Sequence, residues 1–378
     1  MGKKIGKLLL ILAFALIPIL LIWMPFFLRL DTVFGIPLPK NGMETIIANY
    51  DGPLYIVVAK TLYDPSAIAS NYQFPLPTEY YAAHFPLFPL LIKMLGFVMN
   101  FPYAMLIVTV ASSALAIFFF NKLASRFVDN KGAMFLTFVF AVFPARWLIV
   151  RSIGSADPLF VAGILASLYY FRDKKYWLSA IWGAVAVMTK SPGILLFAAY
   201  LLTFFINYIT SKKAVHILKK AYPLLLIPLS LVLVFFFYKI RMNDFLAYFH
   251  SGDNIHLSFL PFQIFNYSAP WVGTFWLEEI IFIYLFGAIG VYRLIAKKEI
   301  ELAAFTGIFY LVILFVAHRD ILRYFLPAVP FLLIAFSDVL IKKEFKIALA
   351  VILIPIYLYS LAFISQNTMP ISNWAPFL

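Results

Sequence analysis

The chain has 378 residues, of which 64% are hydrophobic and 12% charged, whereas an ordinary soluble domain is about 45–50% apolar and about 25% charged. A soluble fold would expose much of this apolar excess to water, so the composition indicates a membrane protein. The net charge is +13, and the absence of cysteine excludes disulfides, cysteine-ligated metals and a cysteine nucleophile.

Apolar stretches of membrane-spanning length run through the whole chain. We expect an all-α integral membrane protein with ten to twelve transmembrane helices, forming a single membrane domain over residues 1–378. The first stretch follows Lys3, Lys4 and Lys7 and is not followed by a small-residue cleavage site, so we interpret it as an uncleaved span. The eleven predicted spans lie near 8–28, 102–121, 132–150, 157–171, 176–190, 191–209, 221–239, 276–296, 302–317, 324–341 and 346–364.

The segment 85–100 is apolar but is interrupted by Pro86, Pro89 and Lys93. We expect it to be a re-entrant or interfacial helix, because it is too short to cross a bilayer comfortably. If it did span, the orientation of every later helix would be inverted.

The distribution of charge predicts the orientation. With the N-terminus in the cytoplasm, 19 of the 30 basic residues but only 6 of the 17 acidic residues fall in cytoplasmic segments. The whole excess charge therefore lies on one face, as the positive-inside rule expects. Topology accounts for the charge, so we expect no nucleic-acid partner.

Two long loops lie on the predicted outer side. The first extracytoplasmic loop covers 29–103 and the second covers 239–274, whereas the cytoplasmic loops are short and basic. Long loops on one side of a membrane protein usually carry its function. We therefore expect the active site on the non-cytoplasmic face.

Two motifs in the first loop carry polar groups next to apolar runs. Asp51 stands between Tyr50 and the turn-forming pair Gly52-Pro53, and Tyr55 follows within an apolar run that can lie in the membrane interface. The alternative for Asp51 is an ordinary helix-capping residue. His84 precedes a proline-containing apolar helix, where it is either a ligand contact or only a polar first residue.

Further charged residues lie at the outer ends of predicted spans, where charge is costly unless it is paired or functional. Snorkelling to the interface is the alternative for Arg151 and Arg319. Asp157 and Lys190 each occupy a tight polar turn and can face a shared cavity. These residues are Arg146, Arg151, Asp157, Lys190, Arg319, Asp320 and Arg323.

The sequence contains no Walker loop, no GxGxxG, no HExxH and no Asp-x-Asp motif, and its five histidines have no ligand spacing. We therefore expect no cofactor and no metal.

Five segments resemble, in order, motifs of membrane glycosyltransferases of the GT-C superfamily. The nearest branch is the second mannosyltransferase of GPI-anchor synthesis and its prokaryotic relatives. Residues 50–59 (YDGPLYIVVA) are similar to WDG-x-x-(Y/F)-x-x-I-A, and 83–92 (AHFPLFPLLI) to the family's F-P-L-(Y/F)-P-L-L-I segment. Residues 155–160 (SADPLF), 189–193 (TKSPG) and 323–327 (RYFLP) resemble SEPLF, T-R-(S/P)-x-G and R-Y-x-x-P. Tyr50, Asp157 and Lys190 depart from the family's Trp, Glu and Arg.

The resemblance implies an inverting transfer of a sugar, with mannose favoured, from a polyprenyl- or dolichyl-phosphate donor to an extracytoplasmic or lumenal glycan or glycolipid. It implies that Asp51 is the catalytic base. The substrate contacts would be His84, Asp157, Lys190, Arg319, Arg323, Tyr50 and Tyr55. The membrane would be the plasma membrane in a prokaryote or the endoplasmic reticulum in a eukaryote. The alternatives are a multi-pass secondary transporter or lipid flippase, and a noncatalytic member that binds a polyprenyl lipid.

Overall fold

The structure is a computed structural model that describes residues 2–72, 74–211, 220–252, 256–266, 268–269, 271 and 275–378. Gln73 and part of the second outer loop lie outside the described residues. So do Lys212, Lys213 and Lys219, which belong to a predicted cytoplasmic loop.

The first half of the described chain builds one long helix, the first outer loop and five further helices. The elements are α1 (Gly2–Phe27), a hairpin of β1 (Thr32–Val33) and β2 (Ile36–Pro37), α2 (Met43–Ile47), α3 (Gly52–Thr61), α4 (Pro65–Asn71), the 3-10 helix η1 (Thr78–Ala83), α5 (Leu87–Leu95), α6 (Phe101–Ala124), α7 (Asn130–Val142), α8 (Ala145–Ser152), α9 (Asp157–Arg172) and α10 (Tyr176–Thr189). The two strands pair antiparallel, with Thr32 opposite Pro37.

The second half is built of helices alone within the described residues. They are η2 (Ser191–Ile194), α11 (Leu195–Ser211), η3 (Tyr222–Leu225), α13 (Leu226–Met242), η5 (Gln263–Phe265), η6 (Phe275–Glu278), α14 (Glu279–Ala296), α15 (Ile300–Ile313), α16 (Ile321–Phe325), η7 (Leu326–Ala328), α17 (Val329–Ala335), α18 (Ser337–Leu340), α19 (Lys343–Gln366) and η8 (Ala375–Phe377).

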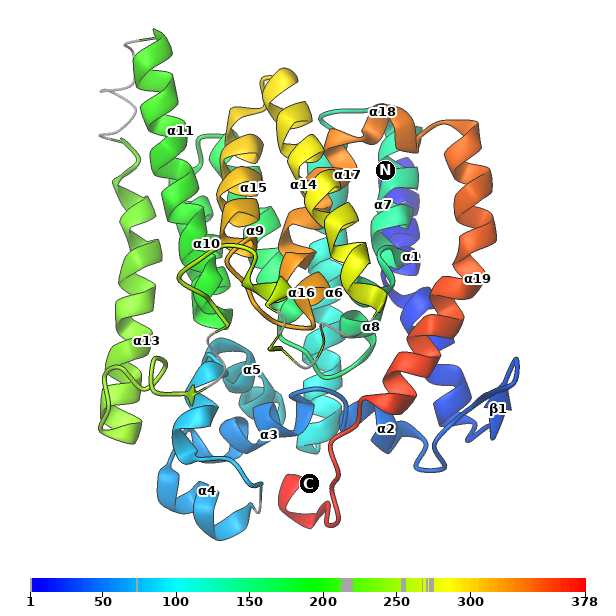
Figure 1. Cartoon of the computed structure of the whole chain (residues 1–378), viewed down its shortest axis with the longest axis vertical. Helices are drawn as coiled ribbons and strands as arrows, with labels where there is room; N and C mark the ends of the chain where they lie inside the picture. Colours follow the sequence, from blue (N-terminus) through cyan, green and yellow to red (C-terminus); the bar gives the residue numbers. More distant parts are fainter. Residues whose placement is uncertain are drawn as a thin grey trace.

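The long helices run roughly side by side, and the short elements gather at the two ends of the bundle. Figure 1 shows α2, α3, α4 and the C-terminal segment at one end, and the N-terminus and α18 at the other. The first outer loop and the C-terminal segment therefore lie together, although they are separated by most of the sequence.

Six helices in the described residues are long and apolar enough to cross a membrane, and a bent pair makes seven. The six segments are Ile5–Phe27, Phe101–Ala124, Ser191–Thr210, Tyr222–Met242, Glu279–Ala296 and Lys343–Gln366. The span predicted at 132–150 is occupied by this bent pair, α7 and α8, whose axes meet at an angle of 70°. Pro144 lies at the break, where proline has no amide hydrogen to continue a helix. The count of eleven spans and their orientation stay predictions.

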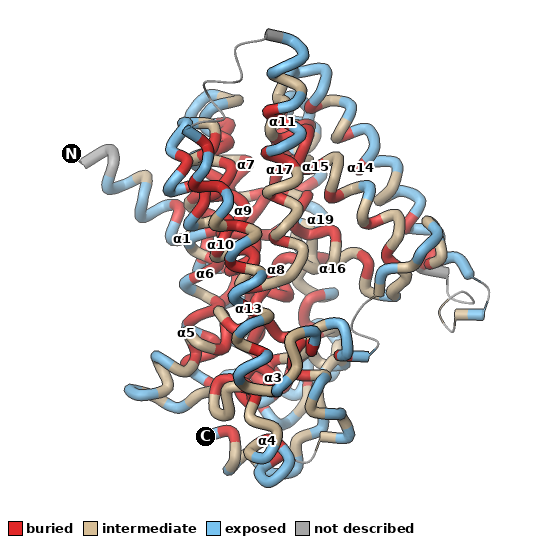
Figure 2. The backbone as a smooth tube through the Cα atoms, turned by 90° about the vertical axis from the view of Figure 1, so that its left-hand side faces the viewer, coloured by how far each residue is buried: buried red, intermediate tan, exposed pale blue. Residues whose placement is uncertain are grey.

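The outward faces of the long helices are apolar. Large side chains stand exposed along α1, α14 and α19, among them Leu9, Ile17, Phe282, Leu285 and Val351. Figure 2 shows buried residues along the middle of the bundle and exposed ones along its flanks. Lipid is the solvent that accepts such faces, since water would make them costly. The chain is thus an integral multi-pass membrane protein, as the composition predicts.

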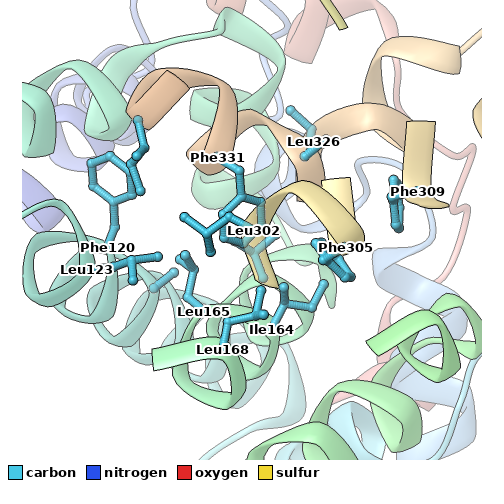
Figure 3. Packing of buried hydrophobic residues seen from close by; sticks show 14 of the residues in the cluster. Phe120, Leu123, Ile164, Leu165, Leu168, Leu302, Phe305, Phe309, Leu326 and Phe331 are labelled. Atoms are coloured by element: carbon cyan, nitrogen blue, oxygen red, sulfur yellow. The ribbon is translucent and has the colours of Figure 1, made fainter. Parts of the chain in front are cut away.

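The core between α6, α9, α15 and α17 is packed with large apolar side chains, and Figure 3 shows Phe120, Leu165, Leu302 and Phe331 within it. Arg151 is buried with the adjoining helices, which corrects the snorkelling interpretation. Its guanidinium donates to Ser113 Oγ at 2.5 Å and to the carbonyl of Ala15 at 2.6 Å. This charge ties α8 to α6 and α1 and does not reach the surface.

The first outer loop folds onto the bundle. In α3 the side chains of Leu54, Val57 and Ala59 are at most 2% exposed, so this apolar run is buried in protein and does not lie against lipid. The predicted re-entrant or interfacial segment contains α5, whose nine residues reach about 14 Å, roughly half the thickness of a bilayer core. α3 and α5 pack on each other and on α6, and they position the loop's polar residues beneath the bundle.

Candidate functional site

Four charged side chains that are far apart in the sequence meet where the first outer loop joins the bundle. They are Asp51, Asp157, Lys190 and Arg323, and we call them the ionic cluster. Asp51 precedes α3, Asp157 begins α9, Lys190 follows α10 and Arg323 lies in α16. All four were candidates from the sequence, and the tertiary structure brings them into contact.

Asp157 is the centre of this cluster. Its Oδ1 pairs with Lys190 Nζ, and its Oδ2 accepts from Arg323 Nε at 2.9 Å and from the Ser155 hydroxyl at 2.9 Å. The side chain is only 5% exposed. A buried carboxylate that accepts from two cations and a hydroxyl fixes its cationic partners and is held in its charged form, so it is a poor acceptor for a substrate proton. The geometry fits a positioning role for Asp157.

Asp51 is arranged differently. Its side chain is 35% exposed, and its Oδ2 lies 3.5 Å from a terminal nitrogen of Arg323. Although it occupies the N-cap position of α3, its carboxylate makes no capping hydrogen bond. Asp64 and Asp129 do cap their helices, by accepting from Ala67 N and Gly132 N. Asp51 thus occupies the turn before α3 without capping the helix through its side chain, and the carboxylate faces Arg323.

The backbone around Asp51 leaves little freedom. Tyr50 has φ of 48°, in the left-handed region that non-glycine residues rarely adopt. At Gly52 an added Cβ would lie 2.6 Å from the carbonyl oxygen of Ile47. Only glycine fits this close approach, and the constraint explains why a Gly-Pro pair follows the aspartate.

A second glycine sets the position of Lys190. A Cβ at Gly193 would lie 2.5 Å from the backbone nitrogen of Val187, so the turn packs directly on α10. The amide of Gly193 donates to the Lys190 carbonyl at 3.0 Å and closes this turn. The Lys-Ser-Pro-Gly sequence therefore places the lysine beside Asp157.

A second set of charges adjoins the ionic cluster. Arg146 of α8 pairs with Asp320 at 3.1 Å, and both contact the Tyr50 hydroxyl, which accepts from Arg146 at 2.6 Å and donates to Asp320 at 2.9 Å. The guanidinium of Arg323 lies over the Tyr50 ring, 4.3 Å from its centroid. Tyr50 thus joins the two sets. The motifs assigned no role to Arg146 or Asp320, and their only signal in the sequence was charge at the ends of apolar spans.

Burial also shifts the pKa values of Asp320 and Tyr50 in this second set of residues. Burial raises the pKa of Asp320, and the neighbouring Arg146 opposes that shift. Burial raises the pKa of the Tyr50 hydroxyl, which therefore stays protonated as a hydrogen-bond donor.

His84 and Tyr55 line the inner side of the first loop. The His84 ring lies edge-on to Tyr55 with centroids 4.9 Å apart, and both side chains are buried. Burial lowers the pKa of His84, so the imidazole is neutral at pH 7. Its Nδ1 has no hydrogen-bond partner in the described part of the chain. A neutral ring suits a hydroxyl contact better than a phosphate contact.

Arg319 stands apart from the other candidates. It is exposed and forms none of the ion pairs found among the described residues, although it lies close enough to His318 to influence that ring. The structure does not bring it into the ionic cluster.

Within the described ranges no group of three His, Asp or Glu side chains is arranged to hold a metal ion. Metal independence stays a prediction.

Comparison with known proteins gives structural matches only. No model of a known protein family matches the sequence, and no curated protein matches it significantly. ArnT from Cupriavidus metallidurans, in a crystal structure bound to undecaprenyl phosphate, superposes with a TM-score of 0.59 at 14% identity over 92% of this chain. An oligosaccharyltransferase from Archaeoglobus fulgidus in its apo form superposes with a TM-score of 0.57 at 13% identity over 96%.

The oligosaccharyltransferase AglB of the same archaeon, in complex with an inhibitory peptide and a dolichol-phosphate, has a TM-score of 0.54 at 13% identity. The chain spans 63% of the length of ArnT and 57% of that of AglB. These neighbours are GT-C superfamily glycosyltransferases, but none is the GPI mannosyltransferase whose motifs the sequence resembles. At such identities the likeness concerns the fold, so this chain is a multi-pass membrane protein with the fold of GT-C enzymes.

Proposed function

We propose that this protein is an inverting glycosyltransferase that moves a sugar from a polyprenyl- or dolichyl-phosphate donor to a hydroxyl of a glycan or glycolipid on the non-cytoplasmic side. The observation that carries the proposal is the partly exposed carboxylate of Asp51 within the ionic cluster, which makes no helix-capping hydrogen bond. The shared fold supports it, because ArnT and AglB were crystallised with undecaprenyl phosphate and dolichol-phosphate.

The reaction needs one base. The acceptor oxygen attacks the anomeric carbon as its proton passes to Asp51, and the bond between that carbon and the phosphate oxygen breaks on the opposite face. The configuration is thereby inverted, and the lipid phosphate leaves with its electron pair. A positioned base of this kind accelerates reactions by about 10²–10⁴-fold.

The leaving phosphate gains negative charge in the transition state. Lys190 and Arg323 are held in place by Asp157 before any substrate arrives, so no reorganisation is needed when the charge develops. The side chain of Lys190 is 26% exposed, which leaves it accessible to a phosphate oxygen. We assign the phosphate contact to Lys190 and Arg323, and the positioning role to Asp157.

Mannose as the transferred sugar is the finer part of the proposal and rests on the motif resemblance alone. Both sugars would lie beside the first outer loop at 29–103, because that loop carries Asp51. Arg319 and His84 remain candidate substrate contacts at the edge of this region.

The test uses purified protein in lipid nanodiscs, polyprenyl-phosphate-mannose as donor, and glycolipids extracted from cells that lack the gene as acceptors. We expect transfer to a glycolipid with inversion at the anomeric carbon, and at least a 100-fold loss in Asp51→Asn. The matched control is Asp64→Asn in the same loop, which removes a carboxylate charge but keeps a side-chain oxygen that can cap α4, and it should retain activity within about threefold.

Two outcomes would contradict the proposal at different points. If the wild-type protein transfers no sugar from mannosyl, glucosyl or galactosyl polyprenyl phosphates, the proposed reaction is wrong. If it transfers sugar and Asp51→Asn does so as fast, the reaction stands and the assignment of the base is wrong.

A further inference from the structure

A separate pocket of about 500 Å³ opens next to the ionic cluster. Its walls come from α2, from the segment just before it and from residues 368–374 of the C-terminal segment. Its volume lies within the range of about 300–1,000 Å³ that is typical of small-ligand sites. Neither the motifs nor the ionic cluster assigns it a role.

The lining of the pocket combines polar groups, one of which is a carboxylate, with an aromatic ring. The polar lining residues are Asn41, Glu44, Thr45, Thr368 and Ser372, and Trp374 supplies the ring. Thr45 is 2% exposed, and its hydroxyl has no hydrogen-bond partner within the described part of the chain. The hydroxyl oxygen has almost no accessible surface, so the polar groups that a ligand can reach are the exposed side chains of Asn41, Glu44, Thr368 and Ser372.

Hydrogen bonds connect the pocket to the candidate base. The amide of Met369 donates to the carbonyl of Ala48 at 2.8 Å, and the amide of Tyr50 donates to the carbonyl of Asn367 at 3.3 Å. The C-terminal segment is therefore fixed along the residues that lead to Asp51. Three peptide units separate Ala48 from Asp51, so their Cα atoms lie within about 11 Å.

We propose that this pocket binds a neutral sugar of the acceptor glycan and thereby presents the next hydroxyl to Asp51. The inference rests on the proposed glycosyltransferase function. Amide, carboxylate and hydroxyl side chains match the dense hydroxyl groups of a sugar, and the indole of Trp374 offers an apolar face to its C–H groups.

The charge of the pocket narrows the ligand class. Glu44 is the one ionisable residue among those that line it. Its carboxylate repels an anionic ligand and accepts hydrogen bonds from neutral hydroxyls. The pocket should therefore select neutral sugars over uronic acids or phosphorylated sugars.

Binding is measured without turnover, by saturation-transfer NMR on the full chain in nanodiscs. The probes are the methyl glycosides of mannose, glucose and galactose, with glucuronate as the anionic comparison. Undecaprenyl phosphate is added in excess, so that a sugar bound at the donor site is displaced. We expect at least one neutral glycoside to stay bound and glucuronate to bind at least about tenfold more weakly, a difference of 1.4 kcal/mol.

The variants test the pocket residues. Trp374→Ala should weaken binding of the neutral glycoside about tenfold, whereas Trp374→Phe, which keeps an aromatic face, should retain most of it. Glu44→Gln should reduce the discrimination against glucuronate. The control for Trp374 is Trp177→Ala, at an exposed tryptophan in α10. The control for Glu44 is Glu79→Gln, at an exposed glutamate that also lies in the first outer loop. Both should leave binding unchanged within twofold, and thermal unfolding reports the integrity of each variant.

The inference is overturned if no neutral glycoside binds, if undecaprenyl phosphate displaces it, or if Trp374→Ala binds it as tightly as wild type. In the transfer assay, Trp374→Ala should raise the acceptor KM and leave the donor KM unchanged. A wild-type protein that transfers sugar, with no change of acceptor KM in this variant, would refute the pocket and leave the proposed function intact.

Discussion

Replacing Asp157 by asparagine removes the charge at the centre of the ionic cluster and nearly preserves its shape. The carboxylate accepts charge-assisted bonds from Lys190 and from Arg323, the latter at 2.9 Å. Each such bond is worth about 1.5–3 kcal/mol. Losing both should cost about 3–5 kcal/mol of stability, which is the range observed when one partner of a buried ion pair is removed.

The cost arises because Lys190 loses the carboxylate it pairs with and Arg323 keeps only the longer contact with Asp51, at 3.5 Å. Unfolding free energy is measured by SDS titration in mixed micelles, in a double-mutant cycle of Asp157→Asn and Lys190→Met. We expect Lys190→Met to be less harmful in the Asp157→Asn background, with a coupling energy of at least about 1.5 kcal/mol. The comparison pair is Arg126 and Asp173, which lie 2.8 Å apart. Because that pair is more exposed, Asp173→Asn should cost less than about 1 kcal/mol.

The rate of sugar transfer gives a second measurement on Asp157→Asn. Loosening the cations that face the leaving phosphate should lower kcat about 10²–10³-fold. Additive effects in the cycle, within about 0.5 kcal/mol, would show that Asp157 and Lys190 do not stabilise each other. That result would refute the cluster as a preorganised unit.

Three further predictions concern other parts of the fold. Gly193→Ala forces a Cβ against the α10 backbone and should destabilise the protein by about 1–3 kcal/mol, whereas Gly6→Ala, with open space around it, should be neutral or slightly stabilising in a thermal melt. Arg151→Met removes the buried donor that contacts the Ser113 hydroxyl and the carbonyls of Ala15 and Ala141, and it should cost about 1–3 kcal/mol in the same SDS titration; retention of wild-type stability would contradict the buried position. Burial, with the nearby His256 and Arg319, lowers the pKa of His318 to about 4. As the pH falls, the histidine in the unfolded chain therefore takes up its proton at a higher pH than the histidine in the folded protein. The free energy of unfolding should be constant above about pH 7 and fall as the pH drops from about 6.5 towards 4. His318→Gln should flatten that part of a pH series of melting temperatures, and an unchanged slope would refute the assignment.

Much of the architecture is readable from the sequence because a bilayer imposes a simple rule. Backbone groups in lipid must be satisfied within the segment, so long apolar stretches have to form helices. Helices appear at each predicted span, for example α6 at 102–121 and α19 at 346–364. The bend between α7 and α8 was not foreseen, since hydropathy averaged over a window does not respond to one proline.

The residues of the candidate site were likewise only partly predictable from the sequence. Asp51, Lys190 and Arg323 were selected from local signals, such as a carboxylate before Gly-Pro and charges at the ends of apolar spans. A local sequence pattern does not reveal which charged side chains form ion pairs in the folded protein. Arg146 and Asp320 gain their relevance only because the Tyr50 hydroxyl, in a turn far from both in the sequence, lies between them.

The sequence by itself determined that this is a helical membrane protein, because hydropathy and charge act through solvent and need no knowledge of neighbours. It also identified a short set of charged residues at the ends of apolar spans, where an unpaired charge is energetically costly. Only the tertiary structure decided that Asp157 is enclosed by two cations while Asp51 stays partly exposed and makes no capping bond, and that the C-terminal segment forms a pocket against α2. These distinctions depend on contacts between segments up to about 300 residues apart, and no local pattern encodes such contacts.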